Sequence, residues 1–112
     1  MKFPIESQIF SEFISNNDLF NKTKENLVQC LNNFYKTDQV RFDEMFEADL
    51  DQVINTYVFK NGGISLGKSF CYDPPLDYTS VWIRIYDNEN DYLAEYTAFY
   101  DLELNCIDDQ LK

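Results

Sequence analysis

The segment of this sequence that is most similar to a metal-binding loop has three carboxylates at alternate positions, Asp87, Glu89 and Asp91. Ca²⁺ prefers carboxylate oxygens, and an EF-hand loop places them at alternate positions. That loop also requires glycine at its sixth position and glutamate at its twelfth, where this chain has Tyr92 and Ala98. We therefore predict no metal or other cofactor, and interpret the segment as a solvated turn between two strands.

Paired carboxyl groups are a second arrangement that could carry out chemistry. Glycoside hydrolysis uses such a pair, and Glu95, Asp101 and Glu103 are the candidates. With 20 acids in 112 residues, however, chance pairs are unavoidable. The absence of histidine removes Ser-His-Asp and Cys-His catalysis and histidine-based zinc sites. We predict that the protein is not an enzyme, and a small carboxylate enzyme with a deep acidic pocket stays an alternative.

Aromatic residues recur at every second position near the end of the chain, which is the spacing of one face of a β-strand. That face carries Tyr92, Ala94, Tyr96, Ala98 and Tyr100, and the preceding segment offers Trp82, Arg84 and Tyr86. Packing beneath helices is the favoured interpretation. The alternative is an exposed platform, because Tyr, Trp and Arg are enriched at protein-interface hot spots. Since Val81, Ile83 and Ile85 occupy the opposite face, one of the two faces must meet something other than water.

Negative charge is concentrated in the C-terminal two thirds of the chain. The formal net charge is −11, from 20 Asp+Glu and 9 Lys+Arg. Residues 1–36 hold four acids and four bases, whereas residues 37–112 hold the other 16 acids and 5 bases. Self-repulsion of this kind costs stability, so the segregation favours docking to a basic protein over a role in solubility alone.

The same charge excludes several classes of partner. Nucleic-acid phosphates require clustered Lys and Arg, and an anionic membrane surface repels an acidic chain. No apolar run approaches the roughly 20 residues of a membrane span, and Met1–Glu6 does not have the pattern of a signal peptide. Cys30, Cys71 and Cys106 are odd in number and widely spaced, which favours reduced thiols. We therefore predict a cytoplasmic protein with no nucleic-acid and no membrane partner.

The first third of the chain has the apolar spacing of helices. One 3.6-residue face holds Ile5, Ile9, Phe10, Phe13 and Ile14, and a second holds Phe20, Leu27, Leu31 and Phe34. Pro4 suits a first helical position, and Asp18 suits the N-cap of a second helix that reaches about Lys36. We predict that these two helices form an antiparallel hairpin.

Residues 37–55 allow two interpretations. The apolar spacing from Phe46 to Tyr57 favours a helix over about 43–54, with Asp43 and Glu44 in its first turn. Val40-Arg41-Phe42 equally suits a short strand. The choice between helix and strand stays open for this region.

From Asn55 the apolar period changes to two. Asn61-Gly62-Gly63 between two extended segments, 56–60 and 64–71, predicts a tight β-hairpin. The prolines in Asp73–Asp77 predict a loop. Strands are expected over Ser80–Tyr86 and Tyr92–Tyr100, and a short one near Cys106–Asp108.

Helices first and antiparallel strands afterwards predict an α+β fold, with N-terminal helices packed on a C-terminal antiparallel β-meander sheet. The length predicts one domain over residues 1–112. Within it, residues 1–36 form a neutral helical hairpin and residues 37–112 an acidic, mostly β part.

The closing segment resembles a known group of proteins. Val81–Asp87, Asp91–Tyr96, Tyr100-Asp101 and Ile107–Asp109 are similar to the C-terminal part of small acidic immunity proteins of bacterial contact-dependent inhibition and polymorphic toxin systems. The opening Phe3–Glu6 and Phe13-Ile14 agree with it. The resemblance implies a cytosolic, non-enzymatic protein that binds one cognate toxin, often a nuclease, and blocks its active site.

We predict an immunity protein that covers the cationic active site of a toxin domain with an acidic surface. The expected partner-binding residues are Asp87, Glu89, Asp91, Glu95, Asp101, Asp108 and Asp109, with Trp82 and Tyr86. The runner-up is a phage or plasmid nucleic-acid mimic that inhibits a DNA-binding enzyme, with acids spaced like phosphates along one ridge. A homodimer through a surplus aromatic face is a further alternative.

Overall fold

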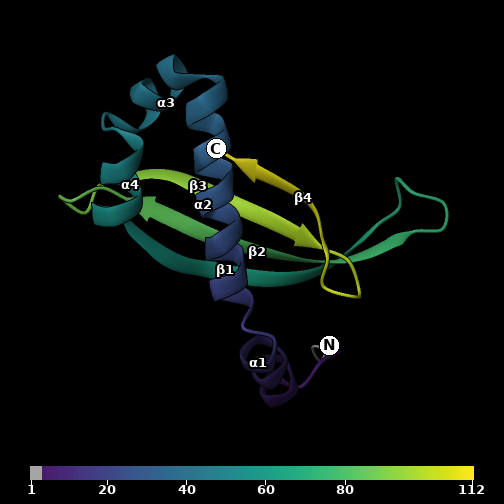
Figure 1. Ribbon diagram of the computed structural model, residues 1–112. Helices are drawn as coiled ribbons and strands as arrows, with labels where there is room; N and C mark the ends of the chain where they lie inside the picture. The colour runs from purple at the N-terminus through teal and green to yellow at the C-terminus, as the bar shows by residue number, and fades with distance from the viewer. Residues whose placement is uncertain (1–3) are drawn as a thin grey trace.

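In the computed structural model, which describes residues 4–112, four helices precede a four-stranded sheet (Figure 1). The helices are α1 (Ser7–Asn16), α2 (Leu19–Thr37), α3 (Gln39–Phe46) and α4 (Leu50–Thr56). The strands are β1 (Val58–Ser69), β2 (Leu76–Tyr86), β3 (Tyr92–Tyr100) and β4 (Cys106–Leu111), antiparallel and in the order β1-β2-β3-β4. The predicted α+β fold is confirmed. Met1, Lys2 and Phe3, with their part of the opening pattern, lie outside the described residues.

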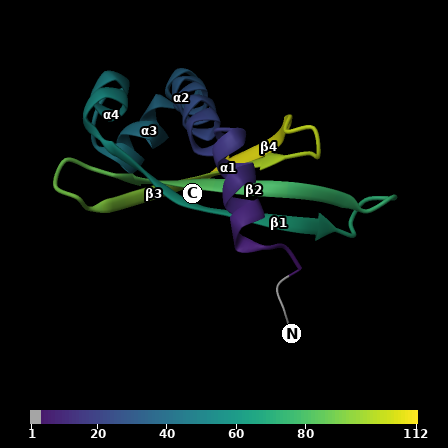
Figure 2. The same cartoon turned by 90° about the horizontal axis from the view of Figure 1, so that it is seen from below.

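The helix layer covers one face of the sheet, which we call the covered face. Figure 2 shows α2, α3 and α4 on this side, and within residues 4–112 no helix lies over the other, open face. α1 lies beyond the N-terminal end of α2, near the β1 edge, and does not run alongside α2 (Figure 1). The predicted antiparallel hairpin is therefore wrong, because Phe10 and Phe13 of α1 turn toward Leu66 of β1 and Leu104.

The core lies between the helix layer and the covered face. The register places Val81, Ile83 and Ile85 of β2 opposite Ala98, Tyr96 and Ala94 of β3, and these six side chains are 0–1% exposed. The helices contribute Leu19, Leu27, Leu31, Phe42, Phe46 and Val53. Burial of this apolar area is the main driving force that holds the helices on the sheet.

The aromatic side chains of β3 divide between the two faces. Tyr96 and Tyr100 are buried on the covered face, which confirms the favoured interpretation for them. The prediction that Tyr96 and Tyr100 share a face with Trp82 and Arg84 is wrong, because Trp82 and Arg84 pair with Thr97 and Glu95 on the open face. The register shifts between Ile85 and Tyr86, so that Tyr86 pairs with Tyr92, which is 54% exposed. The register between two strands decides which alternate residues of one strand share a face with which residues of the other. The spacing of residues within one strand does not reveal this pairing.

Residues 39–56 form two short helices, so the single helix over about 43–54 is wrong, and Val40–Phe42 is helical. The carboxylate of Asp38 accepts from the Arg41 N–H at 3.2 Å, and that of Asp49 accepts from the Gln52 N–H at 2.8 Å. These caps start α3 and α4. Glu47 ends α3 in the left-handed conformation, at φ 53°.

The glycines of β1 do not form a turn. β1 runs through Asn61-Gly62-Gly63 with a register shift there, so the predicted hairpin is wrong. A Cβ at Gly63 would lie 2.3 Å from the Trp82 ring, and a Cβ at Gly67 would lie 2.4 Å from the Tyr78 ring. These glycines are required because aromatic rings of β2 lie against the β1 backbone.

The bounds of several elements differ from the prediction by a few residues. α1 begins after Glu6, so Pro4 precedes the helix. Asp18 is the N-cap of α2 as predicted, but it accepts from the Asn21 side chain at 2.9 Å and not from a backbone N–H. β2 begins at Leu76, inside the predicted loop, and β4 extends to Leu111.

Candidate protein-binding surface

The β2–β3 and β3–β4 turns are built in the same way. One oxygen of Asp87 accepts from the N–H groups of Glu89 and Asp91 at 2.8 and 2.9 Å. Asp101 accepts from Glu103 and Asn105, both at 2.9 Å. Aspartate bonded to its own following backbone is a common way to form a tight turn. Asp87 and Asp101, both among the residues predicted to bind a partner, therefore also shape their turns.

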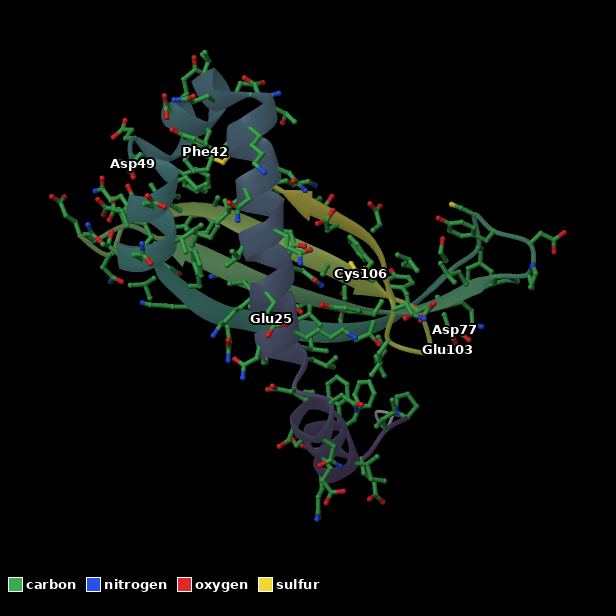
Figure 3. The ribbon with its side chains drawn as sticks, in the orientation of Figure 1. Glu25, Phe42, Asp49, Asp77, Glu103 and Cys106 are labelled. Atoms are coloured by element: carbon green, nitrogen blue, oxygen red, sulfur yellow. The ribbon has the colours of Figure 1, made fainter. Side chains whose placement is uncertain are left out.

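Six acids from two distant segments gather at one end of the sheet, and we call this region the acidic end. Its members are Glu47, Asp49 and Asp51 around the start of α4, and Asp87, Glu89 and Asp91 of the β2–β3 turn. Figures 1 and 2 both place this turn at the same end as α4, and Figure 3 shows Asp49 there. Within residues 4–112 the ion pairs are Lys68–Asp77 and Arg84–Glu95, neither of which involves these six acids.

Tyr57 connects the two halves of the acidic end. Its hydroxyl donates to the Phe46 carbonyl at 2.6 Å, which joins the end of α4 to α3. Burial raises the pKa of its phenol, and the negative charges of Asp87 and Glu47 raise it further. Both carboxylates thus act on the same side chain, one from each segment.

The open face beside the acidic end carries aromatic rings with cations over them. Lys60 Nζ lies 4.4 Å from the centre of the Tyr86 ring and donates to the Asn90 side chain at 3.0 Å. The Tyr86 and Tyr92 ring centres lie 5.8 Å apart. Arg84 Nε lies 3.6 Å from Glu95 Oε2. Tyr86 thus borders the acidic end, whereas Glu95 already has a cationic partner.

The two acids of β4 point to different sides. Asp109 accepts from the buried Tyr96 hydroxyl at 2.7 Å. Burial, then this hydrogen bond and the carboxylate charge, raise the pKa of Tyr96 far above its usual range. Burial and Asp109 also raise the pKa of the Cys30 thiol to about 11. Asp108 pairs with Phe99, on the open side of the sheet.

The nine predicted site residues do not form one patch. The structure brings together Tyr86, Asp87, Glu89 and Asp91, with Trp82 and Glu95 further along the open face. Asp101 lies at the opposite end, and Asp108 and Asp109 lie on the β4 edge.

Sequence reasoning missed Glu47, Asp49 and Asp51. The signal was the six acids of Asp38–Asp51, but nothing in the pattern placed α4 beside a turn that lies far along the chain.

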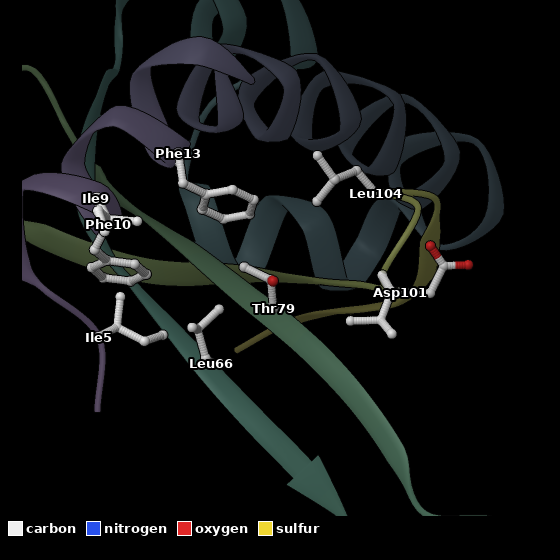
Figure 4. Close-up of a pocket in the computed structure, with 9 residues that line it drawn as sticks. Ile5, Ile9, Phe10, Phe13, Leu66, Thr79, Asp101 and Leu104 are labelled. Atoms are coloured by element: carbon white, nitrogen blue, oxygen red, sulfur yellow. The ribbon is translucent and has the colours of Figure 1, made fainter. Parts of the chain in front are cut away.

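Other kinds of site have less support in the described part of the chain. The hollow in Figure 4, about 300 Å³, has a mostly apolar lining from α1 and Ile5 before it, from β1 and β2, and from the β3–β4 turn, with Asp101 as its one carboxylate. Within residues 4–112, no group of three or more His, Cys, Asp or Glu side chains is placed to hold a metal ion. None of the described helices is both long and apolar enough to cross a membrane.

Comparison of the chain with models of protein families, with curated proteins and with solved structures finds no match. The surface of the molecule itself, above all the acidic end, is therefore what points to a function.

Proposed function

We propose that the protein is an immunity protein that binds and neutralises a basic toxin domain, such as a nuclease, in the cytoplasm. The observation that carries this proposal is the acidic end, where six carboxylates gather and none belongs to an ion pair of the described residues. A site that holds nucleic-acid phosphates is basic, and an acidic surface complements it. Binding alone blocks such a site, so the inhibitor needs no catalytic group of its own.

The contacts narrow the set of acids that are available to the partner. Asp109 is bonded to Tyr96, Glu95 is paired with Arg84, and Asp101 holds its turn. Glu47, Asp51, Glu89 and Asp91 are exposed and accept no side-chain hydrogen bond among the described residues. A typical interface buries about 800 Å² per partner, so these four acids would form its centre, with Tyr86 at the border.

The proposal predicts a toxin gene directly upstream of this chain, and the test uses the domain that this gene encodes, in co-expression and in binding kinetics. The variant with Glu47→Gln, Asp51→Asn, Glu89→Gln and Asp91→Asn removes four charges from the acidic end. The control with Glu12→Gln, Glu25→Gln, Asp73→Asn and Glu103→Gln removes four charges from other exposed positions. We expect the acidic-end variant to associate with the toxin domain about tenfold more slowly than the parent protein does at low salt. The control variant should lose much less than tenfold in association rate.

Two outcomes count against the proposal. If co-expression gives neither rescue from the toxin nor a complex, the protein is not its inhibitor. If both variants slow association equally, the net charge and not the acidic end directs binding. The difference between the variants should also shrink as salt rises, because salt screens exposed charges.

A further inference from the structure

A small hollow on the open face combines three aromatic rings with one carboxylate. Its volume is about 180 Å³, and its lining consists of Ser69, Tyr72, Leu76, Tyr78, Phe99, Ile107 and Asp108. It lies at the end of β2 opposite the acidic end, where β2 begins and the β1–β2 loop projects (Figure 1).

Two of the rings are held in place by the sheet. Tyr78 lies against the backbone of Gly67, where a Cβ would come within 2.4 Å of its Cζ. The centres of the Tyr78 and Phe99 rings lie 5.9 Å apart with an interplanar angle of 64°. Tyr72 comes from the β1–β2 loop and is 59% exposed. The hollow thus has two supported rings and a third that a ligand can reach.

The carboxylate of Asp108 gives the hollow its charge. Asp108 lies directly opposite Phe99 in the β3–β4 register, and its Oδ1 accepts from the Asp109 N–H at 2.9 Å. This hydrogen bond orients the carboxylate and engages one oxygen. No Lys or Arg is among the residues that line the hollow.

Elsewhere this protein places its own cations on aromatic rings. Lys22 lies over Tyr100 at 5.3 Å, Lys60 over Tyr86 at 4.4 Å and Arg84 over Tyr92 at 6.0 Å. In the described part of the chain, no such cation lies over Tyr72, Tyr78 or Phe99. These three rings and Asp108 therefore offer the same chemistry to a cation from outside.

We propose that this hollow binds one Lys or Arg side chain of the basic protein partner, an inference that rests on the proposed function for the identity of that partner. Aromatic faces attract an ammonium or guanidinium group, and the attraction grows when the site is shielded from water. The carboxylate adds a charge-assisted hydrogen bond. Because the 11 residues of β2, about 35 Å, separate this hollow from the acidic end, a partner that contacts both makes an interface larger than the typical one centred on the four acids.

The test measures the hollow directly, with small cations. The protein is titrated with n-butylammonium, with n-butylguanidinium and with neutral 1-butanol, and the ring protons of Tyr72, Tyr78 and Phe99 are followed by NMR. We expect saturable shifts with both cations and not with 1-butanol. Asp108→Asn should weaken cation binding about three- to tenfold.

The matched control is Asp43→Asn, which removes the same charge from an exposed position of α3 and should leave the titration unchanged. Tyr78→Leu should also weaken cation binding, and circular dichroism checks that this variant is folded. If Tyr78→Leu does not fold, the Asp108→Asn variant alone decides the test. Equal shifts with 1-butanol would mean a merely apolar hollow, and equal weakening in both aspartate variants would mean general charge attraction. Either result overturns this inference. Because no basic protein is present, neither result bears on the acidic end.

Discussion

The two faces of the sheet are made from alternate residues of the same strands, yet they differ in the burial and the chemistry of their side chains. On β2, Val81, Ile83 and Ile85 are 0% exposed beneath the helices. Between them, Trp82 and Arg84 lie on the open face, where Arg84 meets Glu95 and Tyr92. A shift of one position along the strand thus changes the role of a residue from stability to surface chemistry.

Polar groups show the same difference. On the covered face, the Tyr100 hydroxyl lies 2.8 Å from the Thr23 hydroxyl and accepts from Asn26 at 3.1 Å, and Tyr96 donates to Asp109. Among the described residues, every buried side-chain polar atom has a partner. On the open face, aromatic rings meet cations and remain accessible to solvent. The covered face satisfies its polar groups internally, while the open face can offer its groups to another molecule.

The largest expected effect comes from neighbouring substitutions on the two faces. Ile83→Ala should lower the free energy of unfolding by about 2–5 kcal/mol, because it leaves a cavity in a fully packed core. Arg84→Ala, one residue away, should change it by less than about 1 kcal/mol. Urea unfolding followed by circular dichroism measures both, and similar losses in the two variants would contradict the comparison.

A second substitution tests whether the open face is also packed against β1. Gly63→Ala would place a methyl group 2.3 Å from the Trp82 ring, so the ring must move. We expect a loss of about 1–3 kcal/mol in stability. Trp82 is the one tryptophan of the chain, so its fluorescence emission reports the displacement. The control is Asn61→Ala, an exposed neighbour, which should leave the emission unchanged.

Titratable groups buried between the helices and the covered face should also make the stability of the protein sensitive to alkaline pH. Burial raises the pKa of Cys30 from 9.0 to about 11, and burial raises the pKa values of Tyr96 and Tyr100. A raised pKa means that the folded state holds its proton more tightly than the unfolded chain does. This stabilisation is complete below about pH 9 and is lost as the pH rises through the folded pKa values, by at most about 1.4 kcal/mol per pH unit for each group.

Urea midpoints measured from pH 8 to pH 11 should therefore fall above about pH 9. In Cys30→Ala the fall between pH 9 and pH 11 should be shallower than in the parent protein. A midpoint that rises over this range would show that these groups are not buried as described.

The smallest expected effect concerns the ion pair on the open face. The side chains of Arg84 and Glu95 are 52% and 35% exposed, so water and salt weaken their attraction. A double-mutant cycle with Arg84→Ala and Glu95→Ala should give a coupling free energy of about 0.2–1 kcal/mol. A value above about 2 kcal/mol would mean that the open face holds the fold together as the covered face does.

The outcome of the sequence predictions follows the range of the interactions involved. The strand Tyr92–Tyr100 was predicted with its observed bounds, because its alternation of side chains is a local property. The prediction failed at Gly62 and Gly63, where glycine serves the close approach of Trp82 and not a turn. It also failed over residues 43–54, where the cap at Asp49 starts a new helix. In the candidate site, the acids of the β2–β3 turn were found, but their neighbours around α4 were missed.

Local patterns in the chain were sufficient for the succession of helices first and strands afterwards, the apolar stripes and the excess of negative charge, because each depends on residues close together in the sequence. Only the folded chain decided which face of the sheet is covered, that Glu47 and Asp87 act on the same tyrosine, and that Asp108 lies beside Tyr78 and Phe99. Those arrangements depend on strand register and on the position of α4 over the sheet. Both are contacts between residues far apart in the sequence, which no local spacing encodes.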